Sequence, residues 1–276
     1  MRRRRALRGA WAQATLILAC VIAIFPLLWI ALASIKNEVD ASAPASKAFD
    51  FTPTLENYRS LFDSPVFITD SITTIVTTIS TTVLCVTVGT LAGYAFARLW
   101  VMGRRLIVTM MVLVQVVPPI VLLIPLYRVV SELGLYDTWI TIIIIQTGLF
   151  TPFVTWLMLA FVRSVPIEVE DAARVDGANR IQLFRYVLIP LLTPGMVAAA
   201  IFTAISAWNS YLVPAVLGQS SAQTLTAFMS TFITTDRLVW AEMCAAAVVI
   251  VGPILALTLV LQRPLVRGIT AGTLKG

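Results

Sequence analysis

The chain has 276 residues, of which 59% are hydrophobic and only 12% are charged, and its formal net charge is +6. A soluble domain carries about twice that charged fraction, so the composition excludes an ordinary soluble protein. No basic element with interleaved aromatic residues is visible, which speaks against nucleic-acid binding. Histidine is absent from the sequence, which removes histidine-based zinc motifs and the most common general base.

Six apolar runs are each long enough to cross about 30 Å of hydrocarbon as a helix. A helix satisfies its own backbone hydrogen bonds in lipid, so the predicted fold class is an all-α integral membrane protein with six transmembrane helices. We expect a basic N-terminus over residues 1–10 and a single transmembrane domain over residues 11–276. The predicted spans are residues 11–34, 71–96, 106–127, 139–162, 190–216 and 240–262.

The first span follows the basic stretch Arg2–Arg5 and has two interpretations. A signal peptide begins in the same way, and Ala31-Leu-Ala33 resembles a cleavage site. The apolar run has about 20 residues, however, whereas the apolar region of a signal peptide has roughly 7–15. A retained first span is therefore favoured.

Glycines and prolines inside the spans predict how the helices pack and bend. The pattern Gly89-Thr-Leu-Ala-Gly93 lets another helix approach closely, and a crossing within the chain is favoured over a dimer face. Proline removes a backbone donor and kinks or breaks a helix. We expect such interruptions in the third, fifth and sixth spans, at Pro118-Pro119 and Pro125, Pro194-Gly195 and Gly252-Pro253 respectively.

The Lys and Arg residues predict the orientation, because cytoplasmic loops carry most of them. With the N-terminus inside, the inner segments hold 15 of the 20 Lys and Arg residues and the outer segments hold 5. We therefore expect a multi-pass protein of a bacterial-type cytoplasmic membrane with both termini and the loop 163–189 in the cytoplasm. Two polar segments, 35–70 and 217–238, are expected outside.

The loop 163–189 lies between the fourth and fifth spans and carries signals for a short helix. Ser164 is a suitable N-cap, Pro166 suits a first turn, and Gly177 is a natural stop because glycine takes the left-handed conformation. These signals predict a helix of about ten residues. A helix this short has little stability on its own.

A second helix is expected to begin after the glycine and lead into the fifth span. Asn179 and Gln182 have the spacing of a capping box at its start. In the first helix, Ala172 and Ala173 leave a low surface flanked by charge. Two interpretations remain open from these residues: a docking site for another protein, or a solvated connector.

These residues resemble the EAA loop of binding-protein-dependent ABC importer permeases. Asp171-Ala-Ala173, Gly177 and Val187-Leu-Ile189-Pro190 match the spacing of that signature throughout. Asp171 replaces its Glu, Val187 its Ile and Ile189 its Leu, and neighbouring Glu170 is an alternative for the acidic position. The resemblance implies a coupling helix that sits in a groove on a cytoplasmic ATPase. The residues expected to couple are Glu170, Asp171, Ala172, Ala173, Arg174, Asp176, Gly177, Val187, Ile189 and Pro190.

The resemblance covers nearly the whole chain and points to the carbohydrate-uptake subfamily. The chain is similar to the second, smaller permease of maltose-type transporters, on four further stretches: Pro53–Tyr58, Leu133–Thr138, Ala207–Pro214 and the tail Gly268–Gly276. It implies half of the translocation path for a sugar, a polyol or a related solute such as a glycerol phosphodiester. The sequence does not distinguish among these solutes.

Energy for transport is expected from a separate subunit, because the chain lacks the Gly-x-x-x-x-Gly-Lys-Ser/Thr phosphate loop. We therefore expect a transport subunit and not an enzyme, with no metal or cofactor of its own and with ATP and Mg on the ATPase. The implied partners are a homologous second permease, two ATPase subunits, an extracytoplasmic solute-binding protein and the lipid bilayer.

Uncharged polar groups within the spans are candidates for the solute path. Gln115 and Gln146 fall near mid-depth, and Trp208, Asn209 and Tyr211 lie near the outer end of the fifth span. Aromatic faces and amides suit sugar rings. The alternatives are equally concrete: a glutamine that bonds a neighbouring helix, and aromatic residues that anchor the chain at the membrane interface.

Two other functions compete with a permease powered by a partner. A self-sufficient secondary transporter is expected to carry charges at mid-span for ion coupling, and the predicted spans have none; Glu242 is near an end. An intramembrane enzyme needs a placed nucleophile with a base or metal ligands. Paired acids at mid-span and histidine are both missing from the sequence.

Overall fold

The structure is a computed structural model that describes residues 2–44, 46, 48–233 and 239–273, with side chains for 13–44, 46, 48–233 and 239–259. The side chains of the basic segment 1–10 and of the tail motif 268–276 are therefore outside the description, as are residues 234–238 of the predicted outer segment. The described residues form helices and no β-strand, which confirms the all-α fold class.

Five of the described helices contain a stretch long and apolar enough to cross a membrane, and a sixth span results if one bent pair is counted together. Most predicted boundaries agree with these helices within a few residues. The long helices are α1 (Arg2–Ser34), α4 (Pro65–Arg98), α7 (Trp139–Ser164), α10 (Ile189–Trp208) and α13 (Trp240–Thr273).

The third predicted span is two helices rather than one kinked helix. Helix α5 (Arg104–Val114) and helix α6 (Pro119–Glu132) meet at an angle of 98°. Pro118 and Pro119 both lack a backbone N–H and restrict the residue before them, so the helix loses consecutive hydrogen bonds at this point. Pro125, in contrast, stays inside α6, where no break occurs.

The prolines of the fifth and sixth spans break neither helix, and the fifth span ends early. Helix α10 runs through Pro194 and α13 runs through Pro253 without a break in either helix. Membrane helices tolerate proline when neighbouring helices satisfy the freed carbonyls. The fifth span, expected to reach residue 216, stops at Trp208, and the separate short helix α11 (Leu212–Leu217) follows it.

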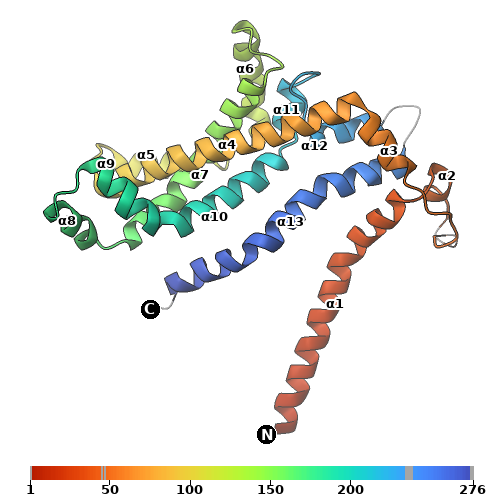
Figure 1. Cartoon of the computed structure of the whole chain (residues 1–276), viewed down its shortest axis with the longest axis horizontal. Helices are drawn as coiled ribbons and strands as arrows, with labels where there is room; N and C mark the ends of the chain where they lie inside the picture. The colour runs from red at the N-terminus through yellow and green to blue at the C-terminus, as the bar shows by residue number, and fades with distance from the viewer. Residues whose placement is uncertain (1, 45, 47, 234–238, 274–276) are drawn as a thin grey trace. The chain divides into compact units, whose positions relative to one another are not determined.

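The chain divides into two compact units, and the larger one comprises residues 68–228 and 254–276. Within it, α4, α7 and α10 lie side by side (Figure 1). Helix α8 (Ile167–Val175) and helix α9 (Arg180–Gln182) are at one end of these helices, and α6 and α11 are at the other end. One apolar core joins the three long helices, and its buried residues include Cys85, Met158 and Leu192.

Glycines bring α4 and α7 into direct backbone contact. A Cβ atom built on Gly93 would lie 2.9 Å from both the Leu159 nitrogen and the Met158 Cβ, and one on Gly89 would lie 2.5 Å from Val154 Cγ1. The Gly89–Gly93 pattern is therefore a close crossing within the chain, as the sequence favoured.

The smaller unit comprises residues 1–67 and 229–253. Its polar segment folds back on the end of α1: the Asn57 amide donates to the carbonyls of Ser34 and Lys36 at 2.8 and 2.7 Å, and the Tyr58 hydroxyl lies 2.7 Å from the Ser34 hydroxyl. The stretch Pro53–Tyr58 thus has a structural role.

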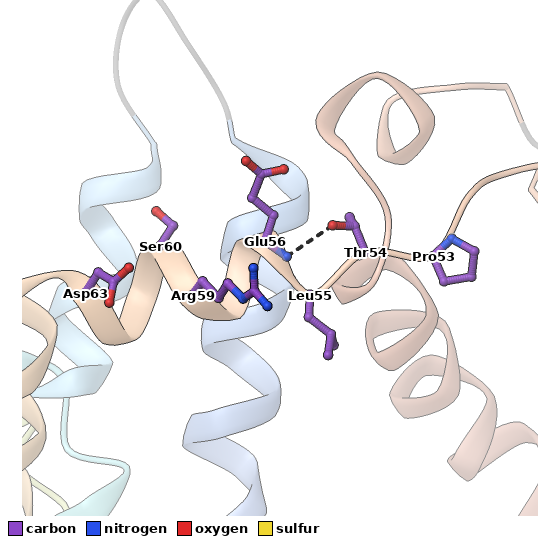
Figure 2. A pocket seen from close by; sticks show the side chains of 7 residues that line it. All are labelled: Pro53, Thr54, Leu55, Glu56, Arg59, Ser60 and Asp63. Carbon is purple, nitrogen blue, oxygen red and sulfur yellow. Dashed lines mark hydrogen bonds between the residues drawn. The ribbon is translucent and has the colours of Figure 1, made fainter.

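A groove of about 780 Å³ lies along the start of α3 (Glu56–Asp63) in the same unit. Figure 2 shows its side chains and the hydrogen bond of 3.1 Å in which the Glu56 nitrogen donates to the Thr54 hydroxyl. This bond helps to start α3, since a hydroxyl before a helix satisfies one of its free donors. The short helix α2 (Glu38–Ala41) precedes this segment, and the Glu38 carboxylate accepts from the Trp240 nitrogen at the start of α13.

Candidate functional site

The loop between α7 and α10 contains the predicted short helix. Helix α8 has nine residues, with Pro166 just before its first residue and with Glu168 and Glu170 in its first turn, where acids are favourable. The predicted cap is wrong: Ser164 is the last residue of α7, and its hydroxyl donates to the Phe161 carbonyl at 2.7 Å. The proline separates the two helices, so the serine belongs to the first of them.

The end of α8 is formed as the sequence predicted. Gly177 has φ +85°, a left-handed conformation that L side chains rarely adopt. The Ala178 nitrogen donates to the Ala173 carbonyl at 3.0 Å, and the Gly177 nitrogen donates to the Arg174 carbonyl at 3.1 Å. These two bonds are those of a Schellman motif, which satisfies the last carbonyls of a helix.

The predicted capping box follows directly. The Gln182 nitrogen donates to the Asn179 side chain at 2.9 Å, and the Asn179 nitrogen donates to the Gln182 side chain at 2.9 Å. The chain then enters a π-helical turn, η2 (Leu183–Leu188), before α10 begins. Pro190 cannot donate to the carbonyl four residues earlier, and a wider turn before it accommodates this loss.

The residues predicted to couple divide into exposed and inward-facing groups. On α8, Asp171, Ala172, Arg174 and the following Asp176 are exposed, and Val175 is 87% exposed. Ala173 is half-buried and packs against the core shared by α4, α7 and α10. Only one of the two alanines therefore contributes to the low outer surface.

The two adjacent acids have opposite environments. The Asp171 side chain is 59% exposed and pairs with Arg174 at 2.6 Å, whereas the Glu170 side chain is fully buried. Glu170 pairs with Arg98 of α4 at 2.5 Å and receives a hydrogen bond from the Tyr94 hydroxyl at 3.2 Å. The acid that the sequence offered as an alternative is thus the internal one.

Arg98 and Tyr94 are functional candidates that the sequence did not reveal. Arg98 counted only as a cytoplasmic basic residue, and its partner Glu170 lies 72 positions further along the chain. Neither motif spacing nor helical periodicity reports contacts across such a separation.

The last three coupling candidates lie in and after the π-helical turn. Val187 is half-buried and packs against the core, and Ile189 and Pro190 are the first two residues of α10. None of them belongs to α8. Their arrangement anchors the loop to the membrane helix that follows it.

Gln115 lies at the break between α5 and α6, beside two hollows. Its amide donates to the Leu149 carbonyl at 3.2 Å. The larger hollow has a volume of about 570 Å³ and mainly apolar walls, and the smaller, of about 230 Å³, is lined also by Phe153 and Trp156. Trp156 is 48% exposed and was not singled out from the sequence.

Gln146 is buried inside α7. Its side chain is fully buried and accepts a hydrogen bond of 3.3 Å from the Thr81 hydroxyl of α4. This supports the alternative stated for it, a glutamine that bonds a neighbouring helix. Trp208 ends α10, the Asn209 amide donates back to the Ile205 carbonyl at 2.8 Å, and Tyr211 is 46% exposed.

The acid of the Leu133–Thr138 motif connects two loops. Asp137 has φ +58°, and its carboxylate accepts backbone hydrogen bonds of 2.6 to 3.2 Å from the four consecutive residues 219–222. Burial acts to raise the pKa of Asp137, but the backbone donors outweigh it and lower the pKa from 3.8 to about 2. Residues 219–222 are thereby fixed to the turn before α7.

Asp137→Asn is expected to lower stability at neutral pH by about 1 kcal/mol, a value reduced for partial exposure. The folded pKa is the lower one, so this stabilisation is present above pH 4 and is lost as the pH falls toward 2. Thermal unfolding of both proteins in detergent at pH 7 and at pH 2.5 measures it. A difference that stayed constant between the two pH values would contradict the assignment.

Comparison with known proteins identifies the family. Residues 86–271 match the family described as binding-protein-dependent transport system inner membrane component. The chain belongs to this family. The match includes the loop with α8 and the internal pair that holds it. Membership decides for a permease component of an ABC transporter over a self-sufficient secondary transporter.

Curated relatives of this permease cover nearly its whole length. It is 36% identical over 92% of its length to the trehalose transport system permease protein SugB of Mycobacterium tuberculosis, which it covers to 93%. It is 30% identical to the maltodextrin transport system permease protein MdxG of Bacillus subtilis, and the match covers 95% of this chain and 94% of MdxG. It is also 30% identical to the diacetylchitobiose uptake system permease protein DasC of Streptomyces coelicolor, and that match covers 99% of this chain and 100% of DasC.

The fold of the permease is shared with solved transporters. It superposes with a TM-score of 0.79 on a bacterial ABC transporter involved in the import of the acidic polysaccharide alginate, at 21% identity, with 95% of this chain and 97% of that one covered. The MetNI methionine ABC transporter gives a TM-score of 0.56 at 21% identity, with 77% and 98% covered.

Proposed function

We propose that this permease is one half of the translocation path of an ATP-driven importer for a sugar or a related uncharged, hydroxyl-rich solute. The observation that carries the proposal is α8, a nine-residue helix with an exposed acid–alanine–apolar face, fixed at its end by a left-handed glycine. Short helices of this kind gain order by docking. Family membership supplies the kind of partner that docks there.

The exposed face of α8 is the proposed contact with a cytoplasmic ATPase subunit. It combines the acids Glu168 and Asp171 with apolar Val175 and the small Ala172. A small residue permits close approach, an exposed valine gains from burial, and the acids select a basic surface. We therefore propose that both termini lie in the cytoplasm, which the distribution of Lys and Arg also favours.

The solute is proposed to be a carbohydrate or polyol. The names of the three curated relatives refer to the transport of trehalose, maltodextrin and diacetylchitobiose. We propose that Gln115, Trp208, Asn209 and Tyr211 face the path, and that Trp156 joins them. The hollow beside Gln115 has mainly apolar walls, so a homologous second permease is expected to supply further polar groups.

The complete importer is proposed to contain this permease, that second permease, two ATPase subunits that bind ATP and Mg, and an extracytoplasmic solute-binding protein. A bacterial alginate ABC transporter has been crystallised in complex with an alginate pentasaccharide-bound periplasmic protein. This permease superposes on a chain of that complex with a TM-score of 0.65. We propose that the loop held by Asp137 lies on the side where such a protein docks.

Val175→Glu is expected to reduce the amount of ATPase subunit that co-purifies with the tagged permease by about tenfold, because it places a charge where an apolar contact forms. Val39→Glu on α2 is the matched control, since Val39 is 80% exposed and Val175 is 87% exposed. The control is expected to co-purify as the wild type does. Failure of the wild-type permease to bring down any nucleotide-binding subunit would refute the proposed function.

A further inference from the structure

A docking helix transmits movement only if it is held firmly by the membrane helices behind it. Helix α8 has nine residues and is mostly exposed, so its attachment depends on few side chains. The fully buried Glu170 is the only acid of the described loop that points inward. Its contacts therefore connect α8 to the rest of the larger unit, together with the packing of Ala173 against the core.

One arginine joins three helices at this place. Arg98, the last residue of α4, donates from Nε to Glu170 of α8 at 2.5 Å. Its Nη2 donates to the carbonyls of Val162 and Val165 at 3.1 and 2.5 Å. These carbonyls lie at the end of α7, and the Val162 carbonyl also accepts from the Val165 nitrogen at 3.2 Å. The planar guanidinium suits several acceptors at once.

The other oxygen of Glu170 completes the arrangement. It accepts from the Tyr94 hydroxyl at 3.2 Å and lies 3.4 Å from the Arg174 guanidinium. The Tyr94 ring also packs edge-on against Phe184 of the π-helical turn, with centroids 5.7 Å apart. The buried carboxylate is thus held from α4 and from α8 itself, beside the segment that leads into α10.

The contact lies directly after the close crossing of α4 and α7. Gly93 leaves no room for a side chain against Met158 and Leu159, so the two helices are in register just before Arg98. A buried ion pair adds little net stability, but it fixes one geometry, because either charge left alone in the interior is strongly unfavourable. This is the property that a mechanical connection requires.

We propose that Arg98 and Glu170 form an internal brace that makes α8 move as one body with the ends of α4 and α7. The proposal rests on the proposed function, in which the exposed face of α8 meets the ATPase. It assigns different tasks to two adjacent acids: Asp171 faces the ATPase, and Glu170 is a positioning residue that passes the movement on.

Glu170→Gln and Arg98→Gln test the brace in the complete reconstituted importer. Both variants are expected to retain the ATPase subunits, because the docking face is unchanged. Solute transported per ATP hydrolysed is expected to fall at least about tenfold, and hydrolysis is expected to lose its response to the loaded binding protein. Arg98→Lys keeps the charge but not the planar fork, so partial recovery is expected. Asp171→Arg is the contrasting control, in which co-purification of the ATPase falls.

A second variant removes the brace without leaving a buried charge alone. Replacing both Arg98 and Glu170 by Met keeps similar volume and is expected to preserve insertion and melting temperature while transport remains uncoupled. Wild-type coupling in this folded double variant would overturn the brace. A wild-type permease that binds no ATPase subunit would instead refute the proposed function, so the two failures are distinct.

A distance measurement that keeps both Arg98 and Glu170 tests the brace even if the substituted variants do not fold. Spin labels at Leu99 and Ile167 follow the end of α4 and the start of α8, and both residues are about half exposed, at 50% and 49%. The three native cysteines are replaced first. The brace predicts the same distance between the labels in the nucleotide-free and ATP-bound importer. A distance that changed with nucleotide would overturn it.

Discussion

Gly177→Pro is expected to abolish solute uptake while the chain remains inserted in the membrane. Gly177 has φ +85°, whereas proline is fixed near φ −65°. Proline also removes the N–H that donates to the Arg174 carbonyl at 3.1 Å. The end of α8 therefore unwinds, and the docking face is no longer presented in one orientation.

The effect arises from the backbone and not from crowding. Among the described residues, and apart from its own chain neighbours, no atom lies within 4 Å of a Cβ built on Gly177, so Gly177→Ala meets only the left-handed strain of about 1–2 kcal/mol. Gly103 has φ +71° and is equally open, but lies outside the coupling loop, so Gly103→Ala is the matched control. Uptake by vesicles is expected to fall in Gly177→Ala and to persist in the control; normal uptake by Gly177→Pro would contradict the coupling role.

Gly93→Val is expected to give the largest loss of stability, about 3 kcal/mol or more, because overpacking against backbone atoms is not relieved by rotamer changes. The added Cβ would lie 2.9 Å from the Leu159 nitrogen and would push α4 away from α7. The melting temperature in detergent and the yield of inserted protein are both expected to fall.

Gly148→Val provides the control for this prediction. Gly148 lies inside α7 and lines the hollow beside Gln115, and a Cβ at that position meets no described atom of another element within 4 Å. It is expected to melt close to the wild type. Equal melting temperatures for Gly93→Val and Gly148→Val would show that the close crossing of α4 and α7 does not limit stability.

The candidate site shows which parts of a loop can be read from sequence. The glycine stop at Gly177 and the capping box of Asn179 and Gln182 were predicted correctly, because each signal acts within one helical turn. The cap at Ser164 was predicted wrongly, because the residue types around Ser164 do not show whether it ends the preceding helix or begins the next one. Ala172 and Ala173 form one motif, yet Ala172 is exposed and Ala173 is half-buried.

The third span shows a similar limit. The prolines at 118 and 119 indicated an irregularity, but not that it would be a bend of 98° between two separate helices. Gln146 had two interpretations that hydropathy treats alike. Its hydrogen bond with Thr81, 65 positions earlier in the chain, supports helix contact over solute path.

By itself, the sequence determined the class of protein, most helix positions, the turn at Gly177 and the family resemblance, because these depend on hydropathy, on local backbone preferences and on short motifs. The tertiary structure alone decided the pairing of Arg98 with Glu170, the capture of residues 219–222 by Asp137, and the contact of Gly93 with α7. Such contacts join residues that are distant along the chain. Interactions between neighbouring residues of the sequence do not specify these contacts. Only the packing of the helices in three dimensions brings the partners together.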